Sequence, residues 1–145
     1  MSPSKRLHPV RRVAESREQK AARHMGESHK HLLAEEAKLT QLRQYHIEYL
    51  QRFEDAAKRG LSSAQLQEYR AFLDKLDDAI RQQEGVVQAH KHEHDSKKDN
   101  WRQSHNRTQA LNKVVDRYQR QELQSADRQE QKESDDRSQR TPPEG

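Results

Sequence analysis

The sequence lacks cysteine, and its 145 residues include only four glycines, four prolines and 5% aromatic residues. Without thiols the chain can form no disulfide framework, no thiolate zinc site and no cysteine nucleophile, which is compatible with a reducing compartment. No window approaches the roughly 20 apolar residues of a membrane span, and the N-terminus lacks the apolar stretch of a signal peptide. We therefore expect a cytoplasmic protein whose contact with a membrane would be peripheral.

Apolar residues are also scarce, at 29% of the chain against 36% charged residues. A chain this polar cannot bury enough apolar surface to form a compact globule. The formal net charge is only +4, so self-repulsion is modest. A long helical structure with a narrow apolar interface satisfies both observations.

The segment around Gly60 predicts that one helix ends and another begins. Lys58 and Arg59 favour the negative end of a helix dipole, and Gly60 can adopt the left-handed conformation that follows a helix. Ser62 and Gln65 then fit a capping box at the start of a second helix. We therefore predict a turn at residues 60–62.

On both sides of this turn the apolar residues keep a seven-residue repeat. Apolar residues at the a and d positions of such a repeat place one stripe toward a partner helix. The positions that define the stripe include Met25, Leu32, Leu39, Leu42, Tyr49 and Phe53 before the turn, and Leu66, Tyr69, Leu73, Leu76, Ile80, Val87, Trp101, Leu111, Val115 and Tyr118 after it.

The short turn implies that the two helices pair antiparallel. One register satisfies the repeat throughout, with Phe53 opposite Tyr69, Tyr49 opposite Leu73, His46 opposite Leu76, Leu42 opposite Ile80, Leu32 opposite His90 and Trp101 opposite Ala21. The sequence thus predicts an all-α fold, a long antiparallel two-helix coiled-coil hairpin over residues 1–134. Helix one should span about 5–59 and helix two about 63–134, followed by a frayed, disordered tail over 135–145.

The nine histidines are the first candidates for chemistry. His90 and His94 share one helical face, but a metal site would need three or four converging ligands. We interpret both as interface residues and predict no metal site. An alternative is that the cluster weakens helix pairing when it is protonated near pH 6.

The sequence contains no recognisable catalytic motif. Paired carboxylates such as Asp77 and Asp78 would need a desolvated cleft to act as acid and base, and a two-helix coiled coil offers none. Glycine-rich phosphate loops and nucleophile motifs are absent from the sequence. We therefore predict that the protein is not an enzyme and needs no cofactor.

Basic residues concentrate at the end of the hairpin away from the turn, where residues 1–31 face residues 86–120 in the proposed register. Residues 1–31 carry eight basic and three acidic side chains, and residues 86–120 carry eight and four. Such a basic end suits an acidic protein surface or phosphates. Nucleic acid is the less favoured partner, because Trp101 and Tyr118, the main aromatic residues there, occupy interface positions.

A second feature is an apolar excess near the turn. Phe72, Leu76, Ala79 and Gln83 follow one another at helical spacing. The stripe could simply widen the helix interface, or it could dock another protein.

Five features of the sequence form a distinctive set, namely YHIEYL at 45–50, GLSSAQL at 60–66, YRAFLDKLDDAIRQQ at 69–83, Trp101, and QKESD at 131–135. Together they resemble the FliJ family of flagellar type III export proteins. The resemblance covers nearly the whole chain. It implies a soluble antiparallel coiled coil of the flagellar export apparatus, similar to the central stalk of rotary ATPases and required for flagellar assembly and motility.

The resemblance also implies partners and the residues that contact them. The stalk would insert into the hexameric export ATPase and link it to the membrane export gate protein, at the cytoplasmic side of the cell membrane, with export chaperones as further candidate partners. The gate would contact Phe72, Leu76, Ala79 and Gln83. The ATPase would contact Arg11, Arg12, Arg17, Lys113 and Arg117. Two alternatives stay open, a basic coiled coil that binds nucleic acid and the equivalent stalk of a virulence secretion system.

Overall fold

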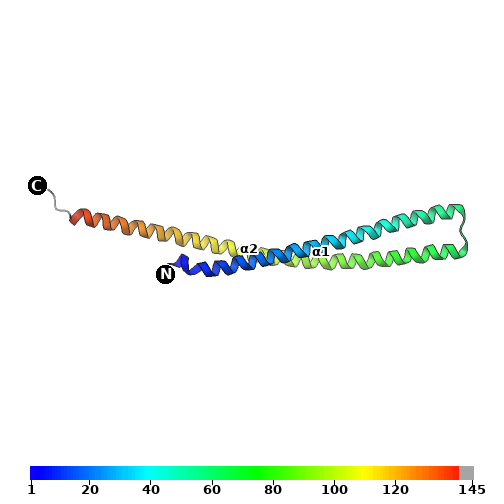
Figure 1. Ribbon diagram of the computed structural model, residues 1–145, viewed down its shortest axis with the longest axis horizontal. Coiled ribbons are helices and arrows are strands. Elements are labelled where there is room, and N and C mark those ends of the chain that lie inside the picture. The colour runs from blue at the N-terminus through cyan, green and yellow to red at the C-terminus, as the bar shows by residue number, and fades with distance from the viewer. Residues whose placement is uncertain (141–145) are drawn as a thin grey trace. The chain divides into compact units, whose positions relative to one another are not determined.

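The computed structural model describes residues 1–140, which form two long helices (Figure 1). Helix α1 spans Pro3–Arg59 and helix α2 spans Ser63–Arg140. Within the described residues no strand occurs. The predicted fold class, an all-α antiparallel two-helix hairpin, is confirmed.

The connection between the helices has the predicted chemistry. Gly60 adopts a φ of 95°, in the left-handed region that favours glycine. The Ser62 amide donates to Oε1 of Gln65 at 3.0 Å, and the Gln65 amide donates to Oγ of Ser62 at 3.2 Å. This reciprocal capping box begins α2 at the predicted residue.

Contacts divide the chain into two compact units, where the sequence had predicted a single hairpin domain over 1–134. The turn unit is Ala22–Asn100, and the terminal unit joins Met1–Ala21 to the α2 residues from Trp101 onward. Each unit contains one stretch of α1 and one of α2, so each has its own helix interface.

Within the turn unit the interface follows the predicted register. The rings of Phe53 and Tyr69, predicted to face each other, have centroids 5.5 Å apart. Leu39, Leu76 and Val87 are buried along the same interface. The heptad repeat therefore identifies the buried face of both helices in this unit.

The terminal unit has an interface of smaller and more polar residues. Ala14 and Thr108, which the same register places opposite each other, are both buried, and Val115 is completely buried. Ser4 is buried as well, where its backbone amide and hydroxyl donate to the two carboxylate oxygens of Glu122 at 3.0 and 2.7 Å.

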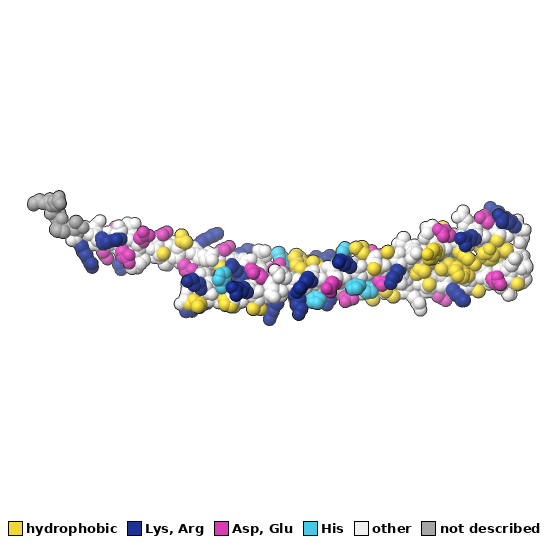
Figure 2. Space-filling model, viewed as in Figure 1, with side chains coloured by type: hydrophobic (Ala, Val, Ile, Leu, Met, Phe, Trp, Pro, Cys, Tyr) yellow, Lys and Arg dark blue, Asp and Glu magenta, His cyan; other side chains and the backbone are white. Residues whose placement is uncertain are grey.

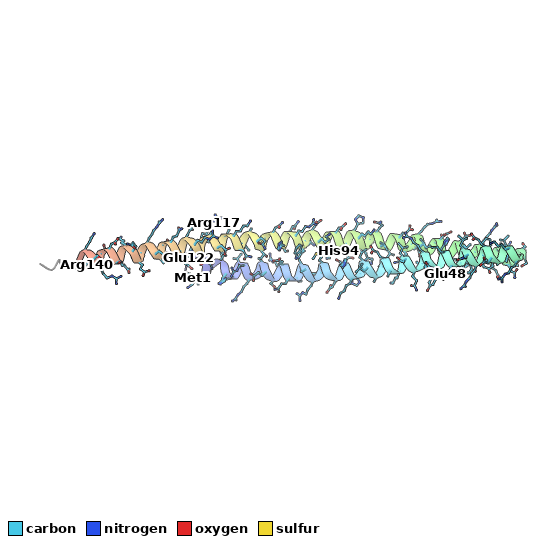
Figure 3. All side chains as sticks on the ribbon, turned by 90° about the horizontal axis from the view of Figure 1, so that it is seen from above. Met1, Glu48, His94, Arg117, Glu122 and Arg140 are labelled. Atoms are coloured by element: carbon cyan, nitrogen blue, oxygen red, sulfur yellow. The ribbon has the colours of Figure 1, made fainter. Side chains whose placement is uncertain are left out.

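Helix α1 begins at Pro3, two residues before the expected start. The Ser2 Oγ accepts from the Lys5 amide at 3.4 Å, and proline suits the first helical position, where no amide hydrogen is needed. Glu122 adds a carboxylate at this positive helix end. Figure 3 shows Glu122 beside the Met1 end of α1.

Helix α2 continues to Arg140, although the sequence had predicted its end near residue 134 and a disordered tail from 135. Side-chain bonds one turn apart support the extension. Gln129 donates to Glu133 at 3.4 Å and Gln131 donates to Asp135 at 3.3 Å. The rest of the predicted tail, 141–145, lies outside the described residues.

Candidate interaction surfaces

The four predicted gate-binding residues, all in the turn unit, do not form one exposed stripe. Phe72 is 44% exposed, whereas Leu76 is only 8% exposed and packs in the interface with α1. Ala79 is half-buried. The Gln83 amide nitrogen donates to the backbone oxygen of Glu35 at 3.0 Å and to its Oε2 at 2.6 Å. Leu76 and Gln83 therefore hold the two helices together.

The exposed apolar surface around Phe72 includes α1 residues that sequence reasoning did not assign to this site. The Phe72 ring packs against Tyr49 with centroids 4.2 Å apart. Tyr45, Ile47 and Leu50 are exposed on α1. Figure 2 shows hydrophobic side chains gathered over the part of the turn unit next to the turn. Tyr45, Ile47 and Leu50 lie outside the a and d positions of the heptad repeat, which could have indicated that they are exposed.

All five predicted ATPase-binding residues lie in the terminal unit. Arg11 is half-buried, with its Nε 3.8 Å from Glu15 and its guanidinium 3.2 Å from Nδ1 of His8. The other four, Arg12, Arg17, Lys113 and Arg117, are exposed. They occupy different heptad positions and so do not converge on one spot. Arg17 lines an open cavity together with Arg107. Sequence reasoning missed Arg107, which has the heptad position of Arg17.

A polar cluster joins the helices of the terminal unit. Because a carboxylate only accepts, Nδ1 of His105 donates to Oε1 of Glu18, at 2.7 Å. The His105 ring also stacks on Trp101 with centroids 4.9 Å apart. Hydrogen bonding from His105, aided by Thr108, lowers the pKa of Glu18 although partial burial opposes the shift.

Hydrogen bonds lower the pKa of two further interface carboxyls. The Ser4 amide and hydroxyl are the main cause at Glu122, and the Gln83 amide followed by Lys38 is the cause at Glu35. In each case the bond favours the charged carboxylate. These carboxylates accept bonds across the helix interface and are not positioned as catalytic pairs.

Four histidines of the turn unit form two pairs across the interface. The rings of His29 and His94 have centroids 5.3 Å apart, and those of His31 and His90 are 6.2 Å apart. No group of three or more metal-ligating side chains converges among residues 1–140. Neither α1 nor α2, over the residues that the structure describes, is long and apolar enough to span a bilayer.

Comparison with known proteins was made at the level of families and of curated sequences. None of the curated proteins matches the chain. The family described as flagellar FliJ protein matches residues 3–142, which is nearly the full length. The match includes both helices, the turn and both candidate surfaces. The chain therefore belongs to the FliJ family of flagellar proteins.

Proposed function

We propose that this FliJ-family protein is a non-enzymatic, stalk-like adaptor that inserts into the flagellar export ATPase ring and couples it to the membrane export gate. Family membership makes the chain a component of flagellar protein export. The observation that carries the finer proposal is the division of its surface chemistry. Exposed apolar side chains gather around Phe72 in the turn unit, whereas an excess of basic side chains lies in residues 1–21 and 101–122 of the terminal unit.

The turn unit offers the surface for the gate protein. Phe72 and Tyr45 are each nearly half exposed, and Tyr49 supports the Phe72 ring from below. Partly exposed aromatic rings held by a rigid interface lose little conformational entropy on binding and are common anchors of protein interfaces. Leu76 and Gln83 would contribute indirectly, by fixing the position of Phe72.

The terminal unit offers the surface for the ATPase. Residues 1–21 carry six basic and two acidic side chains, and residues 101–122 carry five and two. A surface of this sign accelerates association with an acidic partner and makes binding salt-dependent. The protein would act on the cytoplasmic side of the cell membrane, where both partners meet.

The test is a pair of substitutions that change one surface each. Phe72→Asp should abolish gate binding and motility and leave stimulation of the export ATPase intact. Leu123→Asp, an equally drastic change at an exposed apolar residue of the terminal unit, is the matched control for gate binding. Charge reversal of Arg12 and Arg117 should instead weaken ATPase binding, most clearly at low salt.

Three outcomes would contradict the adaptor proposal. Loss of both partners in every folded variant would mean that the surfaces are not separate. Retention of both partners in every variant would mean that neither surface binds. Steep salt-dependent binding to duplex DNA, without any effect on the ATPase, would favour the nucleic-acid alternative.

A further inference from the structure

One face of the terminal unit combines exposed valines with unpaired arginines. Val10, Val13, Arg17 and Arg107 line an open cavity of about 200 Å³ whose floor includes Ala14. We call these four residues the Val–Arg face. Val10 is 43% exposed and Val13 is 52% exposed, although both are apolar. The face therefore joins both helices of this unit through one concave surface.

The two arginines of this face lack intramolecular counter-ions. Within residues 1–140, no hydrogen bond or ion pair engages Arg17 or Arg107, whereas Arg11 on the same helix pairs with Glu15. Two guanidinium groups at one cavity repel each other unless an anion lies between them. Arginine binds carboxylates with planar, paired hydrogen bonds and is enriched at the centres of protein interfaces.

We propose that the Val–Arg face is the part of the basic end that contacts the ATPase, and that it takes an acidic segment with an apolar residue beside its carboxylate. The proposal rests on the proposed function and names the surface within it. A carboxylate would satisfy the arginines while the apolar side chain covers Val10 and Val13. Phosphates of nucleic acid would satisfy the arginines alone and leave the valines in water, so a protein segment fits better.

Two matched charge reversals test the face against the general charge of the unit. Arg107→Glu and Arg120→Glu make the same substitution on exposed residues of the same helix stretch, and Arg120 is not one of the predicted ATPase-binding residues. At low salt, Arg107→Glu should weaken binding of the full chain to the purified export ATPase by roughly tenfold or more, and Arg120→Glu by about twofold or less. Equal losses would overturn the face while leaving ATPase binding itself in place.

Substitution of the two valines is an independent test of the Val–Arg face. Val10→Ser with Val13→Ser should weaken ATPase binding by several fold at every salt concentration, because apolar contact is not screened. Wild-type affinity in this variant would overturn the face. Complete failure of the wild-type chain to bind the ATPase would overturn both the face and the proposed function. A duplex oligonucleotide that competes for the Val–Arg face regardless of the valines would identify it as a phosphate site and also overturn it.

The two histidine pairs of the turn unit carry a second, independent inference. Ser28 donates its single hydroxyl hydrogen to the Met25 backbone oxygen at 2.8 Å. Its contact with Nδ1 of His94, at 2.9 Å, must therefore use a hydrogen carried by His94. Any further proton on His94 must enter at Nε2, on a ring whose centroid is 5.3 Å from that of His29.

The two pairs differ in their surroundings. Near His90, Glu93 lies 3.9 Å away and Glu35 is close enough for His90 to help lower its pKa. No such carboxylate contact occurs at His29 or His94 among the described residues.

The residues around the His29–His94 contact are mostly apolar on α1 and basic on α2. One turn from His29 on α1 lie Met25, Gly26, Leu32 and Leu33, and one turn from His94 on α2 lie His90, Lys91, Lys97 and Lys98. The remaining charged groups on the two facing stretches are His24, Glu27, Lys30, His31, His92 and Asp95.

We infer that the His29–His94 contact is a proton-sensitive joint at which the two helices loosen under mild acid. Protonating both rings would set two positive charges a few ångströms apart beside lysines and without a counter-ion. The two like charges would repel each other across the helix interface, so the helices should separate at this point when both rings are protonated.

Spin-label distances test this joint cleanly, because the chain has no cysteine of its own. Labels on Gly26→Cys and Ser96→Cys report the joint, and labels on Gln51→Cys and Ala71→Cys report the part near the turn. Between about pH 7.5 and about pH 5.5 the first pair should gain a longer-distance population and the second should not.

His29→Gln should abolish that change, whereas His92→Gln, the same substitution at another exposed histidine, should keep it. Circular dichroism at about pH 7.5 verifies that both variants fold, which is expected because neither side chain is buried. An unchanged distance in the wild type, or an equal response in both variants, would overturn the joint.

Discussion

The turn unit and the terminal unit use the same heptad repeat with different side chains. In the turn unit, the rings of Tyr49, Phe53, Tyr69 and Phe72 pack against one another in tilted orientations from one helix to the other. In the terminal unit, buried positions hold Ala14 and Thr108. Apolar burial stabilises at about 25 cal/mol per Å², so the aromatic interface should be the more stable one. The heptad repeat therefore specifies which helix faces pair, whereas the residue types at its positions determine how stable the pairing is.

The polar contacts of the terminal unit give it a different dependence on conditions. Glu18 with His105 and Glu122 with Ser4 hold the helices by hydrogen bonds to charged carboxylates. Such bonds specify a register, because a shift by one residue leaves them unmade, but they depend on pH. The terminal unit, with two such contacts and few large apolar side chains, should therefore be specific and weak, whereas the turn unit, with one such contact at Glu35 and an aromatic interface, should be more stable.

The largest effect is expected in the buried apolar interface of the turn unit. Leu76→Asp places an unpaired carboxylate at a position only 8% exposed and should cost on the order of 3 kcal/mol or more. Urea unfolding followed by circular dichroism measures this loss. Lys75→Asp introduces the same residue at the exposed neighbouring position and should cost little. Equal midpoints for the two variants would contradict the assigned interface.

A smaller effect is expected at the turn. Gly60→Val forces a β-branched residue to adopt a φ of 95° and should cost about 1–2 kcal/mol. Gly85→Ala is the control, because its added Cβ meets open space inside a helix and should be neutral or slightly stabilising. The same urea measurement compares them, and a Gly60→Val chain as stable as wild type would show that the turn does not depend on its left-handed glycine.

The cap that Glu122 provides offers a test confined to the terminal unit. Glu122→Gln keeps the shape but removes the charge that the positive end of α1 favours. The urea transition followed by emission of Trp101, the single tryptophan, should move to lower urea concentration, while the transition of the turn unit stays in place. Equal movement of both transitions would show that the units do not unfold separately.

Acid should produce the most selective change. The pKa of Glu18 is lowered from 4.5, so its stabilising contact is complete above about pH 4.5 and is lost as pH falls below that value. The urea midpoint of the wild-type transition, followed by Trp101 emission, should therefore fall as the pH decreases through this range. In Glu18→Gln this decrease with pH should be absent, and the midpoint should already be lower than that of wild type at neutral pH. A wild-type transition independent of pH below 4.5 would contradict the charged contact.

The sequence predicts local features of this fold well and long-range contacts poorly. Gly60, Ser62 and Gln65 lie within one turn of each other, so their chemistry is readable without a fold. The bond from Glu122 to Ser4 joins residues 118 positions apart, and nothing near Glu122 signals it. Among the predicted gate-binding residues, the repeat placed Leu76 at an interface position, which the structure confirms. The binding roles of all nine predicted site residues stay predictions, because they depend on surfaces of other proteins.

The most direct test of the two-surface account is amide hydrogen exchange of the full chain with and without the export ATPase bound. Slower exchange confined to residues 1–21 and 101–122, with no change over 45–79, is the result that the account predicts. Slower exchange over 45–79, with none in the terminal unit, would contradict it, because the ATPase would then occupy the surface assigned to the gate.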